Sequence, residues 1–373
     1  MRLSRLVFLI PIAYQALVIT AAINRIRRGK RIRCSQTNPA PYRPAVSVLK
    51  PLRGLDPNTE LALLSNIQQD YPVYEVLFGV RDENDPVVPA IRRLQSEHPD
   101  TPIRLITGGL DLPNGKVATL CLLAQHARYP VWVVNDGDIR VDRRYLSSVV
   151  APLENPSIGV VTCPYRAMAH TVPAAWESLG ITSDFMPSTF VAQMLGVREF
   201  GFGSTLAFRA ADLQRVGGFP AIGSYIADDY QLAKRITSLG KRALLSPYVV
   251  ETSLSEDSWI GVWRHQLRWS RTIRASKGAG HLGIPVTHAG AWAAAGLCLG
   301  EFRPVFVLLG FRVLSAALFG GFVLRHRMAF LLSWLAPVWD LYAFAVWGAS
   351  YFRNTVQWRD KTLEIDSEGR IRT

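Results

Sequence analysis

Short apolar runs alternate with longer amphipathic stretches between residues 46 and 163. The apolar runs are rich in Val, Ile and Leu, which predicts buried strands at residues 46–50, 74–80, 103–106, 131–134 and 158–163. The stretches between them have helical spacing, at residues 58–69, 86–98, 115–128 and 141–153. Strands that alternate with helices through short connections form a mostly parallel sheet covered by helices. The pattern therefore predicts an α/β fold with a doubly wound, Rossmann-like sheet.

A long apolar stretch occupies the beginning of the chain. Residues 6–23 are nearly uncharged and about long enough to cross a bilayer, and a basic cluster follows at residues 25–33. Because positive charge marks the cytoplasmic side of a membrane, we expect the chain after Arg25 to lie in the cytoplasm. A cleaved signal peptide that ends near Ala22 is the alternative, and the basic cluster after the span disfavours it.

Apolar stretches also gather near the end of the chain. Residues 305–324 and 328–347 are two further candidate spans, and residues 284–300 form either a third crossing or an interfacial segment. Two charges, Arg312 and Asp340, fall inside the candidate spans. Such charges are costly in a membrane, so we expect them to face protein or a polar cavity; the alternative for Arg312 is that its side chain snorkels to the interface.

The composition agrees with a membrane protein. Of the 373 residues 49% are hydrophobic, the formal net charge is +13 and the sequence pI is about 9.9. Nucleic acid is one partner of a basic chain, but the basic residues gather beside the apolar spans and no nucleic-acid module is visible, which favours an anionic membrane surface. The four cysteines are scattered without the spacing of a zinc site or a disulfide framework, which fits reduced thiols.

Candidate chemistry starts with two carboxylates directly after the strand at residues 131–134. Asp136 and Asp138 are one residue apart, and in an open α/β sheet ligands bind at the carboxyl ends of the strands. Paired carboxylates repel each other unless a cation holds them, and a divalent metal that carries phosphates suits such a pair. The motif points to a nucleotide-diphosphate ligand, although a polar loop with no ligand has the same local sequence.

Two further residues lie at the same predicted edge. Asp82 follows the strand at residues 74–80 and could accept a hydrogen bond from a base or a ribose, while an acidic helix start, with Asp85 as cap, explains the region equally well. Lys116 opens a helix, where a lysine is unfavourable for the helix dipole unless an anion such as a phosphate lies there. A solvated lysine is the alternative.

The adjacent carboxylates Asp228 and Asp229 precede a helix that runs to Gly240. They could simply cap that helix, but a carboxylate on a rigid element is also what a general base requires. Glycines 201 and 203 would allow close backbone approach to a ligand, or form a simple turn.

Residues 259–274 form an amphipathic stretch of aromatic and cationic side chains, which suits a membrane interface. His265, Arg268 and Trp269 lie on it, and an arginine there could clamp a leaving diphosphate. For Arg271 and Arg274 we favour an interfacial anchor.

In this order, these pieces resemble the ceramide glucosyltransferase family, including its bacterial branch of hopanoid-biosynthesis glycosyltransferases. The resemblance covers residues 46–274 and the flanking spans, and it rests on residues 46–54 (VSVLKPLRG), the Asp82 loop, residues 136–141 (DGDIRV), residues 227–230 (ADDY) and the Arg268-Trp269 pair. One departure is that the family usually has Gln or Arg where this chain has His265. That variant, with residues 161–166 and 270–274, resembles the hopanoid branch.

The resemblance implies a GT-A fold, an inverting mechanism, a UDP-sugar donor and a membrane lipid acceptor. By position, Asp82 contacts the nucleoside of the donor, and Asp136 and Asp138 hold the donor together with Mg²⁺ or Mn²⁺. Lys116 joins the candidates for binding the donor because of its place at a helix start. Asp229 is the catalytic base beside Asp228, and His265, Arg268 and Trp269 complete the catalytic set. The irregular, aromatic-rich residues 171–203 are interpreted as an excursion on the acceptor side.

The expected product is a β-glycolipid that carries glucose or N-acetylglucosamine. The expected domains are a transmembrane helix with a basic flank (1–33), a cytoplasmic GT-A domain ending in an interfacial helix (34–280), a transmembrane region (281–352) and a polar tail (353–373). We expect an integral protein of the bacterial inner membrane, with no nucleic-acid partner and no obligatory protein partner. The alternatives are a processive polysaccharide synthase and a noncatalytic membrane protein that binds a nucleotide or a lipid.

Overall fold

The computed structural model describes residues 7–35, 42–56, 58–254, 258–358 and 361–372. The described chain forms two compact units, which are considered separately below. The α/β unit is made of residues 38–165, 197–255 and 370–373, and the helical unit of residues 1–37, 166–196 and 256–369. The division into four domains expected from the sequence stays a prediction.

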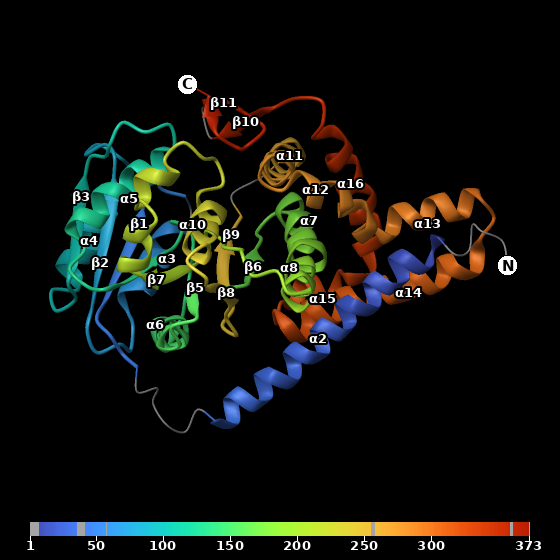
Figure 1. Cartoon of the computed structure of the whole chain (residues 1–373), viewed down its shortest axis with the longest axis horizontal. Helices are drawn as coiled ribbons and strands as arrows, with labels where there is room; N and C mark the ends of the chain where they lie inside the picture. Colours follow the sequence, from blue (N-terminus) through green and yellow to red (C-terminus); the bar gives the residue numbers. More distant parts are fainter. Residues whose placement is uncertain (1–6, 36–41, 57, 255–257, 359–360, 373) are drawn as a thin grey trace. The chain divides into compact units, whose positions relative to one another are not determined.

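The α/β unit is built on a seven-stranded sheet with the order β3-β2-β1-β4-β7-β5-β8 (Figure 1). The strands are β1 (Val46–Pro51), β2 (Tyr74–Val80), β3 (Ile103–Thr107), β4 (Val131–Val134), β5 (Ile158–Thr162), β7 (Leu206–Arg209) and β8 (Arg242–Leu245). β1 to β4 pair in parallel, whereas β7 runs antiparallel to both β4 and β5. The predicted mostly parallel α/β sheet is therefore confirmed.

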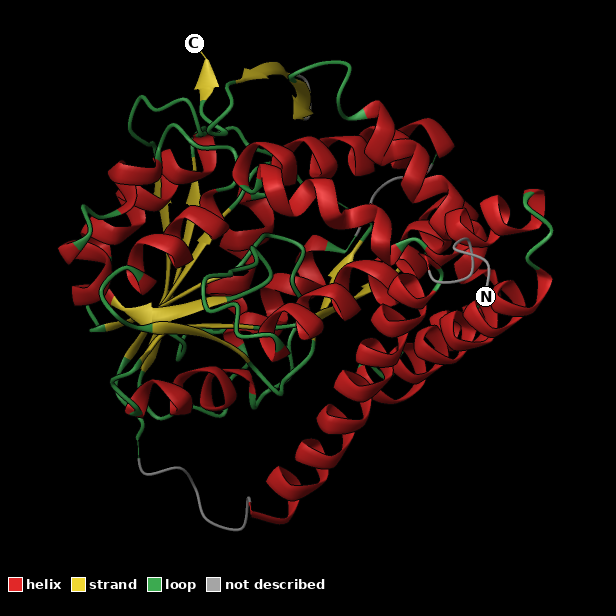
Figure 2. Ribbon diagram, turned by 45° about the vertical axis from the view of Figure 1, so that its right-hand side comes forward, coloured by secondary structure: helices red, strands yellow, loops and turns green. Residues whose placement is uncertain are grey.

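Helices lie on both sides of this sheet (Figure 2). They are α3 (Thr59–Ile67), α4 (Val88–Glu97), α5 (Gly115–His126), α6 (Tyr145–Val150), α9 (Ala210–Arg215) and α10 (Asp228–Thr237). One buried cluster joins side chains of several elements, including Leu77 of β2, Leu123 of α5, Phe208 of β7 and Ile236 of α10. Burying these apolar faces is what fixes the strand ends in place.

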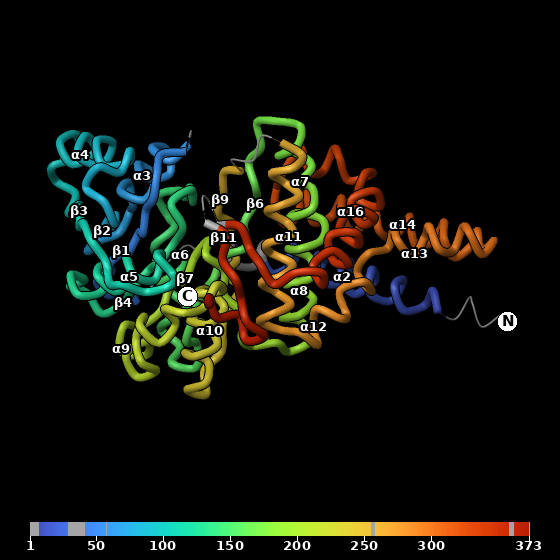
Figure 3. Tube along the Cα trace, turned by 90° about the horizontal axis from the view of Figure 1, so that it is seen from above, coloured from blue at the N-terminus to red at the C-terminus, as the bar shows by residue number. Residues whose placement is uncertain are grey.

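The helical unit brings together three separate stretches of the chain. Its first two stretches contribute α2 (Leu9–Ser35), α7 (Val172–Gly180), the π-helical turn η2 (Ile181–Phe185) and α8 (Met186–Met194). The third contributes α11 (Trp259–Ser276), α12 (Gly278–Gly283), α13 (Ala289–Cys298), α14 (Phe302–Leu318), α15 (Arg327–Leu331), α16 (Ala336–Ala349) and the hairpin of β10 (Thr355–Trp358) with β11 (Lys361–Ile365). α11 lies beside α7 (Figure 3). The region at residues 172–194, expected to be irregular, is almost entirely helical.

Within the described ranges, two helices are long and apolar enough to cross a membrane, by length and composition alone. They are Leu9–Arg28 and the continuous segment Phe302–Val323. The candidate span at residues 328–347 is wrong as a single helix, because a 3-10 turn at Ser333–Leu335 separates α15 from α16. Pro337 in the first turn of α16 accounts for the break, since proline cannot continue a helix from the preceding turn. Leu6, where the first span was expected to begin, lies outside the described residues.

The two charges inside the expected spans form a buried ion pair. The side chains of Arg312 and Asp340 are 2% and 0% exposed, and two guanidinium nitrogens of Arg312 donate to the two carboxylate oxygens of Asp340 over 2.8 and 2.6 Å. A third nitrogen of Arg312 donates to the carbonyl of Ser183 over 2.6 Å, and the amide of Gly290 donates to Asp340 over 3.0 Å. The expectation that these charges face protein is confirmed, and Arg312 does not snorkel.

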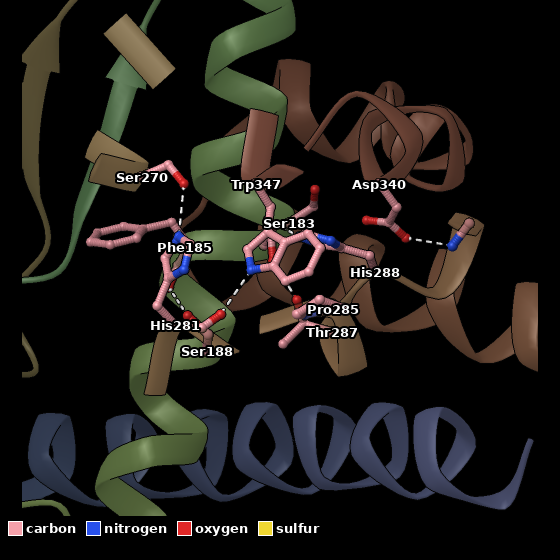
Figure 4. A network of polar contacts seen from close by, with 12 residues as sticks. Ser183, Phe185, Ser188, Ser270, His281, Pro285, Thr287, His288, Asp340 and Trp347 are labelled. Atoms are coloured by element: carbon pink, nitrogen blue, oxygen red, sulfur yellow. Dashed lines mark hydrogen bonds and ion pairs between the residues drawn. The ribbon is translucent and has the colours of Figure 1, made fainter. Parts of the chain in front are cut away.

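A buried histidine links three helices of the same unit (Figure 4). The imidazole of His281 is bonded to the hydroxyl of Ser270 on α11 over 3.0 Å, and its carbonyl accepts from Nε1 of Trp347 on α16 over 2.9 Å. The hydroxyl of Tyr351 lies 2.9 Å from the other ring nitrogen. Polar contacts of this kind define the packing of α11, α12 and α16 more narrowly than apolar contacts alone.

Candidate active site

The sheet places the predicted acidic residues at one edge of the α/β unit. β2 and β4 both pair in parallel with β1, so their carboxyl ends lie at the same edge, roughly 10 Å apart. Asp82 follows β2, whereas Asp136 and Asp138 follow β4. The structure therefore brings Asp82, Asp136 and Asp138 to the same edge of the sheet, where the sequence pattern predicted them.

A lysine joins carboxylates from two separate segments. Nζ of Lys116 lies 2.7 Å from Oδ1 of Asp136 and 3.0 Å from Oδ2 of Asp228. Burial would lower the pKa of Lys116, but the surrounding carboxylates outweigh this and raise it above its usual value. Lys116 therefore remains a cation, which neutralises part of the negative charge of this cluster.

The position of Lys116 is fixed by the start of α5. Asn114 is the N-cap, and its Oδ1 accepts hydrogen bonds from the amides of Lys116 and Val117 over 3.0 and 3.2 Å. The side-chain amide of Asn114 also donates to the carbonyl of Tyr225 over 2.8 Å. The cap fixes the backbone at the start of α5, and the carboxylates of Asp136 and Asp228 offset the repulsion between Lys116 and the helix dipole.

Asp229 is held by two backbone amides. Its Oδ2 accepts from the amide of Gly203 over 2.9 Å, and its Oδ1 accepts from its neighbour Tyr230 over 2.7 Å. Burial, followed by the charge of Asp228, raises the pKa of Asp229 to about 6, while Lys116 opposes the shift. A carboxylate that is fixed in place, with a pKa near neutrality, has the properties of a general base.

Asp138 and the loop before it are supported from two strands. The hydroxyl of Thr252 donates to Oδ2 of Asp138. Burial, followed by the charge of Asp136, raises the pKa of Asp138. The fully buried Lys50 at the end of β1 donates to Oδ1 of Asn135 over 2.8 Å and to the carbonyl of Asp136 over 2.7 Å. Lys50 was missed as a site residue, although a lysine inside an apolar strand was a signal for it.

Gly203 brings its backbone against the same loop. The amide of Asp136 donates to the carbonyl of Gly203 over 2.9 Å, and a Cβ at Gly203 would lie 2.3 Å from Oδ2 of Asp136. From the sequence, Gly203 was expected either to allow close approach of the backbone to a ligand or to form a simple turn. The structure shows that it is the Asp136 carboxylate which approaches.

The turn after β2 keeps Asp82 at the surface. Oδ1 of Asp82 accepts from the amide and the side chain of Asn84 over 2.9 and 3.2 Å. Asp85, expected to act as a cap, accepts from the amide of Val87 over 3.0 Å, and its two oxygens also accept from the amide of Gly54 over 2.9 Å each. Asp82 is therefore exposed to ligands at the edge of the sheet, and Asp85 has a structural role.

The carboxylates after β4 fit a divalent metal that is shared with a ligand. Within the described ranges no group of three or more His, Cys, Asp or Glu side chains is arranged to hold a metal alone. Asp136 and Asp138 supply hard oxygen ligands, and 41% of the Asp136 side chain is exposed. Mg²⁺ is usually bound by one or two carboxylates together with substrate phosphates and water, so the two residues fit a metal that arrives with a diphosphate.

His265, Arg268 and Trp269 lie on α11 in the helical unit. Nδ1 of His265 is 2.6 Å from Oε1 of Glu177, and the rings of His265 and Trp269 are 4.8 Å apart. The Trp269 ring also contacts that of Phe185, at 5.4 Å between centroids. His265 and Trp269 are four residues apart, about one helical turn, so their side chains lie next to each other on the same face of α11.

Arg271 and Arg274, for which we favoured an interfacial anchor, have protein partners. Arg271 donates to the carbonyl of Thr355, and Arg274 donates to the carbonyl of Arg353 over 3.3 Å. These hydrogen bonds attach Arg353 and the first residue of β10 to α11. Both arginines therefore have partners within the protein, which the sequence pattern alone could not reveal, and their role as an interfacial anchor stays a prediction.

Comparisons with known proteins agree with this arrangement. The model of the family described as glycosyl transferase family 21 matches residues 4–371. The chain is 28% identical to ceramide glucosyltransferase 1 of Caenorhabditis elegans over 237 residues, 63% of this chain and 51% of that protein. It is 32% identical to a ceramide glucosyltransferase of Komagataella phaffii over 113 residues, 29% of this chain and 22% of that protein. The chain thus spans about half or less of the length of these relatives.

A solved structure with the same fold is the mannosyltransferase PcManGT from Pyrobaculum calidifontis, in complex with GDP-Man and Mn²⁺. The TM-score is 0.53 at 24% sequence identity, and the match covers 90% of this chain and 99% of that one. At this identity the likeness establishes the fold. The expected GT-A fold is confirmed.

Proposed function

Because the chain belongs to glycosyl transferase family 21, we propose that it transfers a hexose from a UDP-sugar to a hydroxyl of a membrane lipid. The observation that carries this proposal is the cluster of Asp136, Asp228 and Asp229 around Lys116 at the carboxyl edge of the sheet. The relatives named as ceramide glucosyltransferases support a lipid acceptor and glucose as one candidate sugar. N-acetylglucosamine is the other.

Asp229 acts as the base in this proposal. Its carboxylate takes the proton of the lipid hydroxyl while the hydroxyl oxygen attacks the anomeric carbon of the sugar. The bond between that carbon and the diphosphate oxygen breaks, and UDP leaves with the bonding electrons. Attack opposite the leaving group inverts the configuration, so an α-linked donor gives a β-glycoside. A pKa of about 6 leaves Asp229 deprotonated at neutral pH.

The remaining residues bind and orient the substrates. Asp136 and Asp138 would hold Mg²⁺ or Mn²⁺, which when bound neutralises charge on the departing diphosphate. Asp82 would contact the nucleoside, and Lys116 the donor phosphates. His265, Arg268 and Trp269 would complete the catalytic set from α11.

We place the protein in a membrane, with Leu9–Arg28 and Phe302–Val323 as candidate spans. The basic residues after the first span support a cytoplasmic position for the α/β unit, by the positive-inside rule. In a bacterium this is the inner membrane. The acceptor would then remain in the bilayer throughout the reaction, whether it is of the ceramide or the hopanoid type.

The test is transfer by the purified full-length protein in lipid nanodiscs. The protein is incubated with labelled UDP-glucose or UDP-N-acetylglucosamine, a total lipid extract and Mg²⁺ or Mn²⁺, and the labelled products are identified by mass spectrometry. A glycolipid that Asp229→Asn does not form supports the proposal. A lipid-free polymer would instead indicate a processive synthase. Absence of both transfer and metal-dependent hydrolysis of the donor would indicate a noncatalytic binding protein.

A further inference from the structure

Glu177, a buried glutamate of α7, is hydrogen-bonded to His265. The Glu177 side chain is 0% exposed, and its Oε1 accepts from Nδ1 of His265 over 2.6 Å and from Nε2 of Gln266 over 2.7 Å. Its other oxygen, Oε2, is also buried and has no hydrogen-bond partner within the part of the chain that the structure describes. All three residues belong to the helical unit.

The hydrogen bonding of the buried Glu177 carboxylate does not favour the stability of the fold. A buried carboxylate is costly unless all its lone pairs are satisfied, and replacement by an apolar residue of similar volume is often neutral or favourable. Here one oxygen carries two hydrogen bonds and the other carries none. A function that depends on the carboxylate would explain why the fold tolerates it.

The contacts of Glu177 determine which nitrogen of His265 carries the proton. Because Oε1 is an acceptor, Nδ1 must be the donor. In a neutral imidazole the other nitrogen, Nε2, then has a free lone pair and can only accept. Among the described residues none is bonded to Nε2, and 17% of the His265 side chain is exposed. The neighbouring Trp269 ring, 4.8 Å away, restricts rotation of the imidazole.

We propose that Glu177 is a positioning residue that fixes His265 with its proton on Nδ1, so that Nε2 accepts a hydrogen bond from a hydroxyl of the lipid acceptor. The proposal rests on the proposed function. An acceptor nitrogen repels the oxygens of a diphosphate but suits a neutral O–H group. The sugar of the donor also carries such groups, so the kinetics below are designed to show a loss that is specific to the lipid. Arg, one of the residues usual in the family at this position, would present only N–H groups, whereas Gln, the other, carries both an acceptor oxygen and N–H groups.

The tautomer is measured first, because this measurement needs no activity. The full chain is labelled with ¹⁵N-histidine in nanodiscs, and His265→Gln identifies the signal of His265 by its disappearance. We expect a protonated Nδ1 and an unprotonated Nε2 in the wild type at pH 7.5, and loss of this pattern in Glu177→Leu, because leucine has no acceptor for Nδ1. An imidazolium, or a proton on Nε2, in the wild type would overturn the proposal.

Kinetic measurements then test whether Glu177 and His265 act on the lipid or on the UDP-sugar. We expect Glu177→Leu to lower kcat/KM for the lipid about 10- to 100-fold, as for other carboxylates that orient a functional histidine, and to leave KM for the UDP-sugar unchanged. The double variant with His265→Gln should be no slower than His265→Gln alone, because Glu177 acts through His265. Equal losses toward both substrates, or multiplicative losses in the double variant, would contradict this.

A matched control separates positioning from packing. Gln266→Leu removes the other hydrogen bond to Oε1 of Glu177 and leaves that of His265 in place. We expect it to keep the wild-type tautomer and the lipid kcat/KM. A loss as large as that of Glu177→Leu would assign Glu177 a structural role. If the wild type transfers no sugar at all, the proposed function fails, whereas the tautomer measurement still decides the role of Glu177.

Discussion

Gly203 and Asp136 are so close that a Cβ on Gly203 would lie 2.3 Å from Oδ2 of Asp136. Real Cβ atoms do not make such contacts, and the neighbour that must shift is a carboxylate, not a part of the core. Gly203 is therefore the residue that allows Asp136 to occupy its observed position.

We predict that Gly203→Ala lowers transfer roughly 100-fold, because a misplacement of about 1 Å at a site can have that effect. The melting temperature should change little, because the clash involves a side chain at the edge of the sheet. Gly109→Ala is the control, since its Cβ would meet Ala118 at an ordinary 3.5 Å. Equal activity of the two variants would argue against a fixed position for Asp136.

The rate of transfer should depend on the protonation of Asp229. Burial and Asp228 raise its pKa to about 6, and a base is active only when deprotonated. We therefore expect kcat/KM to be constant above pH 7 and to fall as the pH decreases through about 6. Asp229→Asn should abolish turnover and leave UDP-sugar affinity, measured by calorimetry, largely intact. Near-normal turnover in this variant would remove Asp229 from the role of base.

The charge of Lys116 should determine the pH at which kcat/KM falls on the acid side of the profile, which is called the acid limb below. Lys116 lowers the pKa of Asp229, so Lys116→Met should raise this pKa and move the limb to higher pH. The pH profile of kcat/KM measures the shift, and activity at pH 8.5 should be closer to the wild type than activity at pH 7. Lys234→Met, on the exposed face of α10, is the control and should leave the limb unchanged. An unshifted limb in Lys116→Met would mean that Asp229 is not the titrating group.

Buried Lys50 predicts a pH-dependent stability. Burial lowers its pKa from 10.5 to about 7, so between these values the unfolded chain binds more protons than the folded one. Stability therefore rises with pH across this range. We expect the advantage of the wild type over Lys50→Met in melting temperature to grow from pH 7 to pH 9. A difference that is independent of pH would show that Lys50 titrates alike in both states.

The Arg312–Asp340 pair predicts non-additive effects on stability. Removal of one partner leaves a buried charge, so Arg312→Met or Asp340→Leu should each destabilise the fold by about 3–5 kcal/mol. The double variant should lose much less than the sum. Thermal unfolding in detergent measures these changes, with exposed Arg303→Met of the same helix as the control. Additive losses would mean that the two charges do not depend on each other.

Local pattern was enough to predict much of the α/β unit. Buried strands such as Val131–Val134 are unbroken apolar runs, and Asn114 marks the start of α5 with a side chain that suits a cap. The carboxyl ends of parallel strands lie at the same edge of a sheet. The pattern of strands therefore also predicted that Asp82 and Asp136, each of which follows a strand, lie at one edge of the sheet.

Contacts between distant segments could not be predicted in this way. Lys50 and Asn135 are 85 residues apart, and Glu177 and His265 are 88 apart, so no local period connects them. The antiparallel strand β7 between β4 and β5 depends on sheet pairing, which the alternation of elements does not determine. The break before α16 was overlooked because hydropathy alone does not register Pro337.

The helices that pack together in the helical unit are synthesised at very different times, which has a consequence for biosynthesis. Helix α2 leaves the ribosome early, but α14, against which it packs, follows far later, and the bond between Gln15 and Ser315 spans 300 residues. During most of translation the first helix must therefore persist without its eventual neighbour, in contact with lipid, the insertion machinery or chaperones. A nascent chain arrested before residue 302 should accordingly expose Gln15, which is 1% exposed in the finished protein, to cross-linking that the finished protein resists.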